Sequence, residues 1–511
     1  MNLRSLNDRR LASPRRLWLL PLLGAALVVA GCASTPSSGV EPNVSPSVPT
    51  GWQTPLPGAA DPRIATTELV DWWQRFNSPA LPGLIAAAQQ ASPTLASAVA
   101  RIEQARTTRI AAGAALLPRV DAVAGVGHGR SQLGMPVATT ANAGLQASWE
   151  IDVFGANAAA RGAAQARLEG SQAGWHDARI SLAAETAQSY ASLRACEAQL
   201  VQARLDAESR AATARLTEQS AGAGFTAPAD AALVRAGAAQ SRSQAVNQRA
   251  TCDTLLKSLV ELTDLPEAEL RQRLAGATAQ LPQPQAIGVD VLPAHLLAQR
   301  PDLAQAARNV VAAAADHQRS RARELPQVSL TGSLLGVSAR MAEVTQSGTT
   351  WSIGPLTVSL PLFDLGARGA ATTAARASYD EAVAVYRAQV RRAIREVEAS
   401  LVALQATAER EADARLAAQD FDAALRATEA RQRGGLASLL DLENARRNAV
   451  QAQIALIDLQ RERTAAWISL YRALGGGWKA DQLDAPIRTS HAGWSSFSHG
   501  IAAQPNPKNR P

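Results

Sequence analysis

A long helical pattern occurs twice in this chain, and the two copies lie 211 residues apart. The first copy runs from Gly155 to Leu265 and the second from Gly366 to Gly476, and both are rich in Ala, Arg, Gln and Leu. Each copy is interrupted once, at 221–228 in the first and at 434–438 in the second. This tandem repeat predicts two copies of one long helical hairpin, with each interruption forming a turn.

The helical segments carry the spacing of coiled coils. Across Leu442–Leu459 apolar and small residues recur at alternating steps of three and four, and across Val383–Leu404 a Val or Leu recurs every seven residues. These positions form the seams along which helices pack. A helix over Ala156–Ser220 would be roughly 95 Å long at 1.5 Å per residue. The pattern therefore predicts rods that are longer than a single globular domain needs.

Four segments show the two-residue period that is typical of β-strands. They cover about residues 118–129, 143–153, 326–338 and 350–363. In the second segment one face is apolar, and the other is small or polar and includes Glu150 and Asp152. In the fourth, Trp351 and Ile353 fall on the opposite parity from the rest, which predicts a bulge or a register change near Gly354-Pro355. The alternation fits a transmembrane barrel with a polar lumen, and it also fits a soluble hairpin.

Strands of membrane-spanning length constrain the number of chains. Each repeat supplies two strands, and four strands leave open edges that lipid does not tolerate. If the strands span a membrane, several chains must share one barrel, and three chains would give twelve strands. After residue 31 the sequence contains no stretch that is long and apolar enough for a membrane helix.

The N-terminus has the layout of a bacterial signal peptide. Residues 1–31 hold five Arg and a short apolar segment, and the following Cys32 completes a motif that resembles a lipobox. This resemblance implies cleavage before Cys32 and a lipid on that residue, whereas the alternative is an uncleaved anchor with a chance Cys. Loss of 1–31 reduces the formal charge from +7 to +3, which is not the footprint of a nucleic-acid-binding protein.

Composition predicts the borders of the remaining segments. Residues 32–62 are rich in Pro, Ser and Thr and are interpreted as a lipidated N-terminal tether. The first repeat is predicted over 63–284 and the second over 285–478. The polar, Pro-containing segment 479–511 is predicted to be a disordered C-terminal tail.

Two cysteines of the mature chain are placed symmetrically about the first turn. Cys196 and Cys252 each lie 28 residues from Gly224, so equal arms of a hairpin bring them level with each other. Both have apolar neighbours at seam spacing. An oxidising compartment would join them in a disulfide, and the alternative is a pair of buried thiols.

Several motifs occur in a characteristic order along residues 60–478. They are Asp71-Trp72-Trp73, the Ala100–Arg106 run, Leu117-Pro118, Ser148–Gly155, Arg300–Leu303, Leu360–Gly366 and Gly435–Asp441. With the lipobox and the tandem repeat, they resemble the outer-membrane efflux protein family of the TolC/OprM type, and within it the lipoprotein branch often called NodT. The resemblance implies a mainly α fold with a β-barrel portion: a long α-helical coiled-coil tunnel, plus four strands per chain in a trimeric, 12-stranded outer-membrane barrel.

The function implied by this resemblance is passive conduction. A homotrimer, lipid-anchored in the outer membrane with its helices in the periplasm, would be the exit duct of a tripartite efflux system. Its partners would be a periplasmic adaptor protein and an inner-membrane pump of the RND type, and its cargo would be small molecules or drugs. The alternative within the same fold is the outer-membrane channel of a type I protein secretion system.

The resemblance also assigns roles near the two turns. Leu440 and Asp441 would form apolar and anionic rings of a periplasmic gate, and Asn444 stands where relatives often have a second Asp. The alternative for Leu440 and Asp441 is a seam Leu and an acidic residue favoured at a helix N-terminus. The turn residues would contact the adaptor, or would simply form tight turns. They are Gly222, Gly224, Phe225, Arg433, Gly434, Gly435 and Ser438.

Two further classes of function find little support. For an enzyme, the glycine run at 125–129 does not open a helix, and the six His residues show no metal-ligand spacing. We therefore predict no catalytic residues, no metal and no cofactor. A purely structural coiled-coil spacer would lack the four alternating segments.

Overall fold

The computed structural model describes residues 49–55, 66–130, 136–284, 286–287, 298–341 and 344–479. The predicted signal peptide, Cys32 and the tail from residue 480 lie outside the described residues. In chain order the elements are η2 (Thr66–Arg75), α2 (Ala80–Ala91), α3 (Pro93–Ala114), β1 (Arg119–Gly129), β2 (Ala138–Ile151), α4 (Ala156–Gly222), α5 (Pro228–Thr263), α6 (Glu267–Leu274), η3 (Ala275–Ala277), α8 (Pro301–Ala322), β3 (Gln327–Met341), β4 (Val344–Ser359), α9 (Ala367–Arg433) and α10 (Leu439–Ala473).

The chain divides into two compact units. The strand unit contains Ala115–Ala160 and Ala315–Thr373. The helical unit contains Arg161–Ala314 together with the segments from Pro46 to Ala114 and from Ala374 onward. The fold is thus mainly α with a β portion, as the two periodicities predict.

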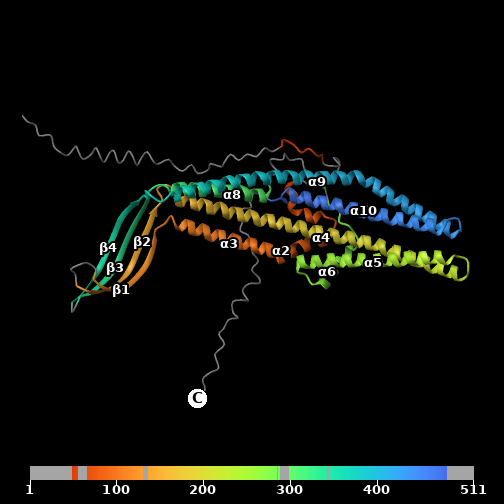
Figure 1. Cartoon of the computed structure of the whole chain (residues 1–511), viewed down its shortest axis with the longest axis horizontal. Helices are drawn as coiled ribbons and strands as arrows, with labels where there is room; N and C mark the ends of the chain where they lie inside the picture. Colours follow the sequence, from red (N-terminus) through yellow and green to blue (C-terminus); the bar gives the residue numbers. More distant parts are fainter. Residues whose placement is uncertain are drawn as a thin grey trace, which may run out of the picture. The chain divides into compact units, whose positions relative to one another are not determined.

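The helical unit contains two long hairpins, α4 with α5 and α9 with α10 (Figure 1). α4 and α9 have 67 residues each, and α5 and α10 have 36 and 35, so the repeat is preserved in length. Ala, Arg, Gln and Leu favour helices of this length. Among the described residues, no helix combines the length and the apolarity that a bilayer-spanning segment needs.

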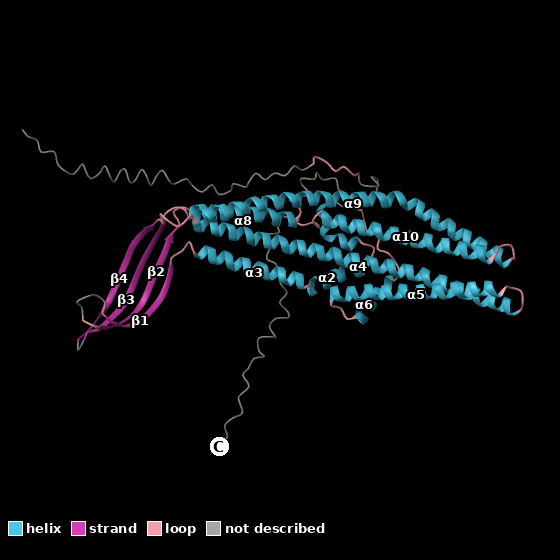
Figure 2. Cartoon of the chain, viewed as in Figure 1, coloured by secondary structure: helices cyan, strands magenta, loops and turns pink. Residues whose placement is uncertain are grey.

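The four strands form one antiparallel sheet in the order β1-β2-β3-β4 (Figure 2). Residues that lie directly opposite each other on neighbouring strands share a face of the sheet, so the register shows which side chains lie on each face. One face is apolar or small, with Val120, Ala147, Trp149, Leu330, Leu334, Trp351, Ile353 and Leu356. The other face is mainly polar, with Gln146, Ser148, Glu150, Ser329, Thr331, Ser333, Ser352 and Thr357.

The bulge predicted in the fourth strand is confirmed. The register between β3 and β4 shifts between Leu330, which lies opposite Leu356, and Gly332, which lies opposite Ile353. β4 thus has two residues where β3 has only Thr331, and one of the two is Gly354 with φ +110°. The extra residue returns Ile353 and Trp351 to the apolar face, which explains their apparent change of parity.

Three strands differ from their predicted bounds by three residues or more, and the first of them is β3, which ends at Met341 rather than 338. β2 begins at Ala138 rather than 143, because residues 138–142 pair with β1 although they alternate weakly. β4 covers Val344–Ser359 rather than 350–363. Its early residues pair with the end of β3, whereas Leu360–Phe363 leave the ladder ahead of α9. Backbone pairing therefore extends the strands beyond the hydrophobic signal.

The largest core cluster lies in the helical unit, where η2 and α2 pack on the long helices. Trp72 is fully buried and stacks on Tyr471 of α10, with ring centroids 5.0 Å apart. Tyr190 of α4 is also buried, and its hydroxyl bonds the Ser78 hydroxyl at 2.6 Å. Aromatic side chains from η2, α4 and α10 thus meet in this core cluster.

Candidate functional site

The two hairpin turns have the same hydrogen-bond pattern. Gly224 N–H donates to Ala221 and Phe225 N–H to Ser220, and Gly435 and Leu436 repeat both bonds 211 residues later, all between 2.8 and 3.0 Å. This is the Schellman ending of α4 and α9. Gly224 and Gly435 have φ of +82° and +71°, a conformation that favours Gly.

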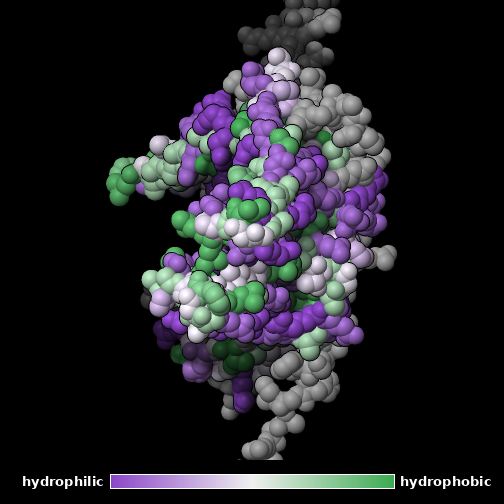
Figure 3. Space-filling view, turned by 90° about the vertical axis from the view of Figure 1, so that its right-hand side faces the viewer, coloured by the Kyte–Doolittle hydropathy of each residue, from purple (hydrophilic) through white to green (hydrophobic). Residues whose placement is uncertain are grey.

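Both turns expose an apolar side chain. Phe225 is 86% exposed and Leu436 is 74% exposed. The end-on view in Figure 3 shows hydrophobic patches between hydrophilic ones on this side of the molecule. Each turn therefore presents one large apolar side chain to solvent.

The predicted gate residues lie on the first turns of α10. Leu440 is 61% exposed, and Asn444 follows one turn later on the same side of the helix. Asn444 accepts a hydrogen bond from Arg447 at 3.3 Å. The structure therefore brings Leu440, Asp441 and Asn444 together on one exposed helix end.

Asp441 also caps its helix. Its Oδ2 accepts hydrogen bonds from the Ser438 hydroxyl at 2.7 Å and the Ser438 N–H at 3.0 Å, and Ser438 Oγ accepts from Asp441 N–H at 3.1 Å. This is a capping box. The bonds from the side chain and backbone of Ser438 lower the pKa of Asp441. The carboxylate thus has a local structural role in addition to any role in a gate.

The first hairpin contains a disulfide between Cys196 of α4 and Cys252 of α5, with Cα atoms 5.6 Å apart. Both residues are buried in the main core cluster. Next to the bond, Gln248 donates to Gln199 at 3.0 Å, and Gln199 donates to Asp458 of α10 at 3.0 Å. A chain of side-chain amides therefore connects the disulfide-linked hairpin to the second hairpin.

Replacing Cys196 and Cys252 with Ala is expected to lower the free energy of unfolding of the helical unit by about 2–4 kcal/mol, because the bond restricts the unfolded chain. The cysteines are 56 residues apart, so a substantial loop is released. Thermal unfolding followed by circular dichroism measures the effect, and the reduced wild-type protein should match the double variant. An unchanged midpoint in both would contradict a stabilising bond.

Ion pairs join the hairpins nearer to their turns. Arg210 of α4 contacts Asp206 at 2.9 Å and also pairs with Glu443 of α10. Glu443 in turn pairs at 2.8 Å with Arg446, which is buried and lies 3.8 Å from Glu429 of α9. Sequence reasoning missed this network, because the two pairs that join different helices, Arg210 with Glu443 and Arg446 with Glu429, follow no spacing rule.

A second missed cluster surrounds Arg300, at the start of the second repeat. The buried guanidinium pairs with Asp302 and with Glu396 of α9 at 2.8 Å, and it donates to the carbonyl of Ala473 at 2.9 Å. The Arg300–Leu303 motif was the only sequence signal for this cluster. The side chain joins the beginning of α8, the middle of α9 and the end of α10.

In the helical unit, α4 also carries a buried His176 and a half-buried Asp177, whose pKa values are shifted. Burial and the nearby Arg179 charge lower the pKa of His176 to about 4, so its ring is neutral at physiological pH. Burial, with the nearby Asp302 charge, raises the pKa of Asp177. For both residues, loss of contact with water is the main cause of the pKa shift, and it favours the uncharged form of the side chain.

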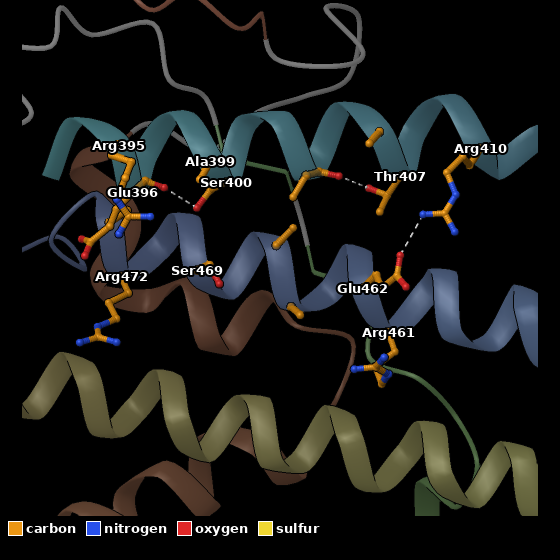
Figure 4. A pocket seen from close by; sticks show the side chains of 15 residues that line it. Arg395, Glu396, Ala399, Ser400, Thr407, Arg410, Arg461, Glu462, Ser469 and Arg472 are labelled. Carbon is orange, nitrogen blue, oxygen red and sulfur yellow. Dashed lines mark hydrogen bonds and ion pairs between the residues drawn. The ribbon is translucent and has the colours of Figure 1, made fainter. Parts of the chain in front are cut away.

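A groove of about 560 Å³ lies between α9 and α10 (Figure 4). Its rim carries four arginines, Arg395, Arg410, Arg461 and Arg472. Arg410 pairs with Glu462 at 3.0 Å, and the hydroxyls of Ser400 and Thr407 donate to carbonyls of their own helix. The lining contains no His or Cys, and its carboxylates are Glu396 and Glu462. In the described part of the chain, no group of His, Cys, Asp or Glu is arranged to hold a metal ion.

Known proteins share this architecture. The crystal structure of the outer membrane protein VceC from Vibrio cholerae matches with a TM-score of 0.73 and 26% identity, over 80% of this chain and 99% of that one. The pyoverdine export outer membrane protein OpmQ of Pseudomonas putida is 32% identical over 483 residues, which cover 92% of this chain and 98% of that protein. The outer membrane protein OprJ of Pseudomonas aeruginosa is 30% identical, over 82% of this chain and 89% of that protein.

A family model extends the likeness to both repeats. The model described as outer membrane efflux protein matches residues 84–265 and 292–476. These two segments contain the four strands, both hairpins and both turns. The chain therefore belongs to the outer membrane efflux protein family, whose members are outer-membrane efflux channels.

Proposed function

We propose that this chain is the exit duct of a tripartite efflux system and passively conducts small molecules. The observation that carries the proposal is the sheet, whose apolar face suits lipid and whose polar face suits a water-filled lumen. Relatives named for pyoverdine export and for solvent efflux favour small molecules over polypeptides as cargo.

The working unit in this proposal is a homotrimer with a 12-stranded barrel. Within the described sheet, β1 and β4 are edge strands, each paired on one side only. Unpaired backbone groups are not tolerated in lipid, so β1 of one copy would pair with β4 of the next. Three copies with four strands each would close a barrel of plausible size.

The remaining parts are assigned by their position and chemistry. Residues 1–31 would be removed, and Cys32 would carry the lipid at the start of the tether 32–62. Residues 63–284 and 285–478 would be the two repeats, and 479–511 the tail. The exposed turns with Phe225 and Leu436 would contact the periplasmic adaptor, which in turn would engage an RND-type pump in the inner membrane.

The two hairpins would have different tasks. The disulfide clamps the first hairpin, so we assign it the role of a fixed tunnel wall. The second hairpin has no cysteine and carries Leu440, Asp441 and Asn444 at the start of α10, so we assign it the role of the moving periplasmic gate.

Single-channel recording in planar bilayers tests the proposed function. The Cβ of Gly144→Val would lie 2.1 Å from the Leu334 carbonyl oxygen, so this variant should disrupt the sheet and abolish conductance. The matched variant Gly129→Ala meets open space and should conduct like the wild type. A wild-type protein that forms heat-modifiable trimers but never conducts would overturn the proposal.

A further inference from the structure

The polar face of the sheet carries more negative than positive side chains. Among the described strand residues, the ionisable side chains on this face are Arg119, Asp121 and Glu150. The other side chains of the face are mainly hydroxyls, amides and glycines. One cation and two anions leave a net negative charge on the surface that would line a lumen.

The positive charge and one negative charge are already paired. Arg119 Nε lies 2.9 Å from Asp121 Oδ2, and these two residues share the polar face of β1. The neighbouring Asp152, just beyond β2, accepts hydrogen bonds from Asn157 and Ala158 N–H at 3.0 and 2.7 Å. Its charge therefore offsets the positive end of the α4 helix dipole.

Glu150 has no such compensation. It lies opposite Ser329 on β3 and is exposed, one residue before the end of β2. Within the part of the chain that the structure describes, no cation or hydrogen-bond donor contacts its carboxylate. Glu150 therefore contributes the uncompensated charge of the polar face.

We propose that Glu150 is a charge-selectivity determinant of the barrel lumen, which favours cations over anions independently of the periplasmic gate. This inference rests on the proposed trimeric channel, because symmetry would then place three such carboxylates at one level. In water a unit charge about 7 Å from a passing ion changes the local ion concentration roughly two- to threefold, and three charges combine within about one Debye length.

The test measures reversal potentials of the full-length channel in planar bilayers under a KCl gradient. Glu150→Gln should lower the ratio of cation to anion permeability about twofold or more and should leave the frequency of channel insertion unchanged. The matched variant Glu261→Gln removes an exposed carboxylate of α5 instead and should keep the wild-type ratio.

Chemical modification of a cysteine allows the charge at position 150 to be set to negative, neutral or positive. The chain has three cysteines, of which Cys196 and Cys252 are bonded and Cys32 is the proposed lipid site, so Glu150→Cys would introduce a unique thiol. An anionic methanethiosulfonate reagent should restore cation preference, and a cationic one should reverse it. The assignment of Glu150 would be overturned if the variants conduct but neither Glu150→Gln nor the charge added to Glu150→Cys changes the ratio of cation to anion permeability. Absence of conductance in every variant and the wild type would instead overturn the proposed function.

Discussion

Bridging α4 to α10 between positions 210 and 443 is expected to abolish most channel openings. The variant Arg210→Cys/Glu443→Cys, joined by a bis-maleimide linker, would replace an ion pair that already connects the two hairpins with a covalent bond. If the second hairpin moves to open the periplasmic end, this bond holds it against the disulfide-clamped first hairpin. Single-channel recording before and after linkage measures the loss of open probability.

A bridge inside the second hairpin is the matched control. Glu429→Cys/Arg446→Cys replaces an ion pair between α9 and α10, so a hairpin that moves as one body should still open. Conversely, Glu443→Gln removes the charge that holds Arg210 and should raise the open probability of the unlinked channel. Unchanged conduction in the 210–443 bridge would show that the second hairpin is not the moving gate.

Removal of the buried Arg300 side chain is expected to destabilise the helical unit by about 3 kcal/mol, because two half-buried carboxylates lose this cation, although Glu396 keeps its ion pair with Arg392. Arg300→Leu would remove two ion pairs and the hydrogen bond to the Ala473 carbonyl, and would leave Glu396 and Asp302 without their shared cation. Thermal unfolding of the purified protein, followed by circular dichroism, measures the loss.

An exposed arginine provides the control for Arg300. Arg376→Leu breaks an ion pair with Asp380 in which both side chains are 57% exposed. Exposed pairs of this kind contribute at most about 1 kcal/mol. Equal shifts in the unfolding midpoint for Arg300→Leu and Arg376→Leu would contradict the role of Arg300 in joining α8, α9 and α10.

Local periodicity and the tandem repeat were sufficient to predict most of the architecture. The 211-residue offset predicted two copies of one helical hairpin, and the long helices of the two copies have equal lengths. Because Cys196 and Cys252 are equally far from Gly224 along the chain, the sequence predicted that they lie level with each other, and in the structure they form a disulfide. These inferences succeed because a helix or a hairpin depends on residues that are close in sequence or related by a fixed rise.

Strand ends were less predictable. Residues 138–142 alternate weakly, yet they pair with β1, and residues 344–349 pair with the end of β3. Backbone hydrogen bonds do not depend on side-chain polarity, so a hydrophobic pattern underestimates the length of a strand. The parity change at Trp351 was visible in the sequence, but only the register showed that the bulge restores a continuous apolar face.

By itself, the sequence determined the repeated hairpins, the two-faced strands, the symmetric cysteines and the order of motifs, since each follows from spacing along the chain. Only the tertiary structure decided which charges meet. Arg210 with Glu443 and Arg300 with Glu396 lie 233 and 96 residues apart and follow no periodic rule. Arg119 and Asp121, by contrast, are two residues apart on one strand, so the strand period already places them on one face, and only the register shows that Glu150 lies opposite Ser329 rather than a cation. Charge compensation depends on distances of a few ångströms, which packing and register create.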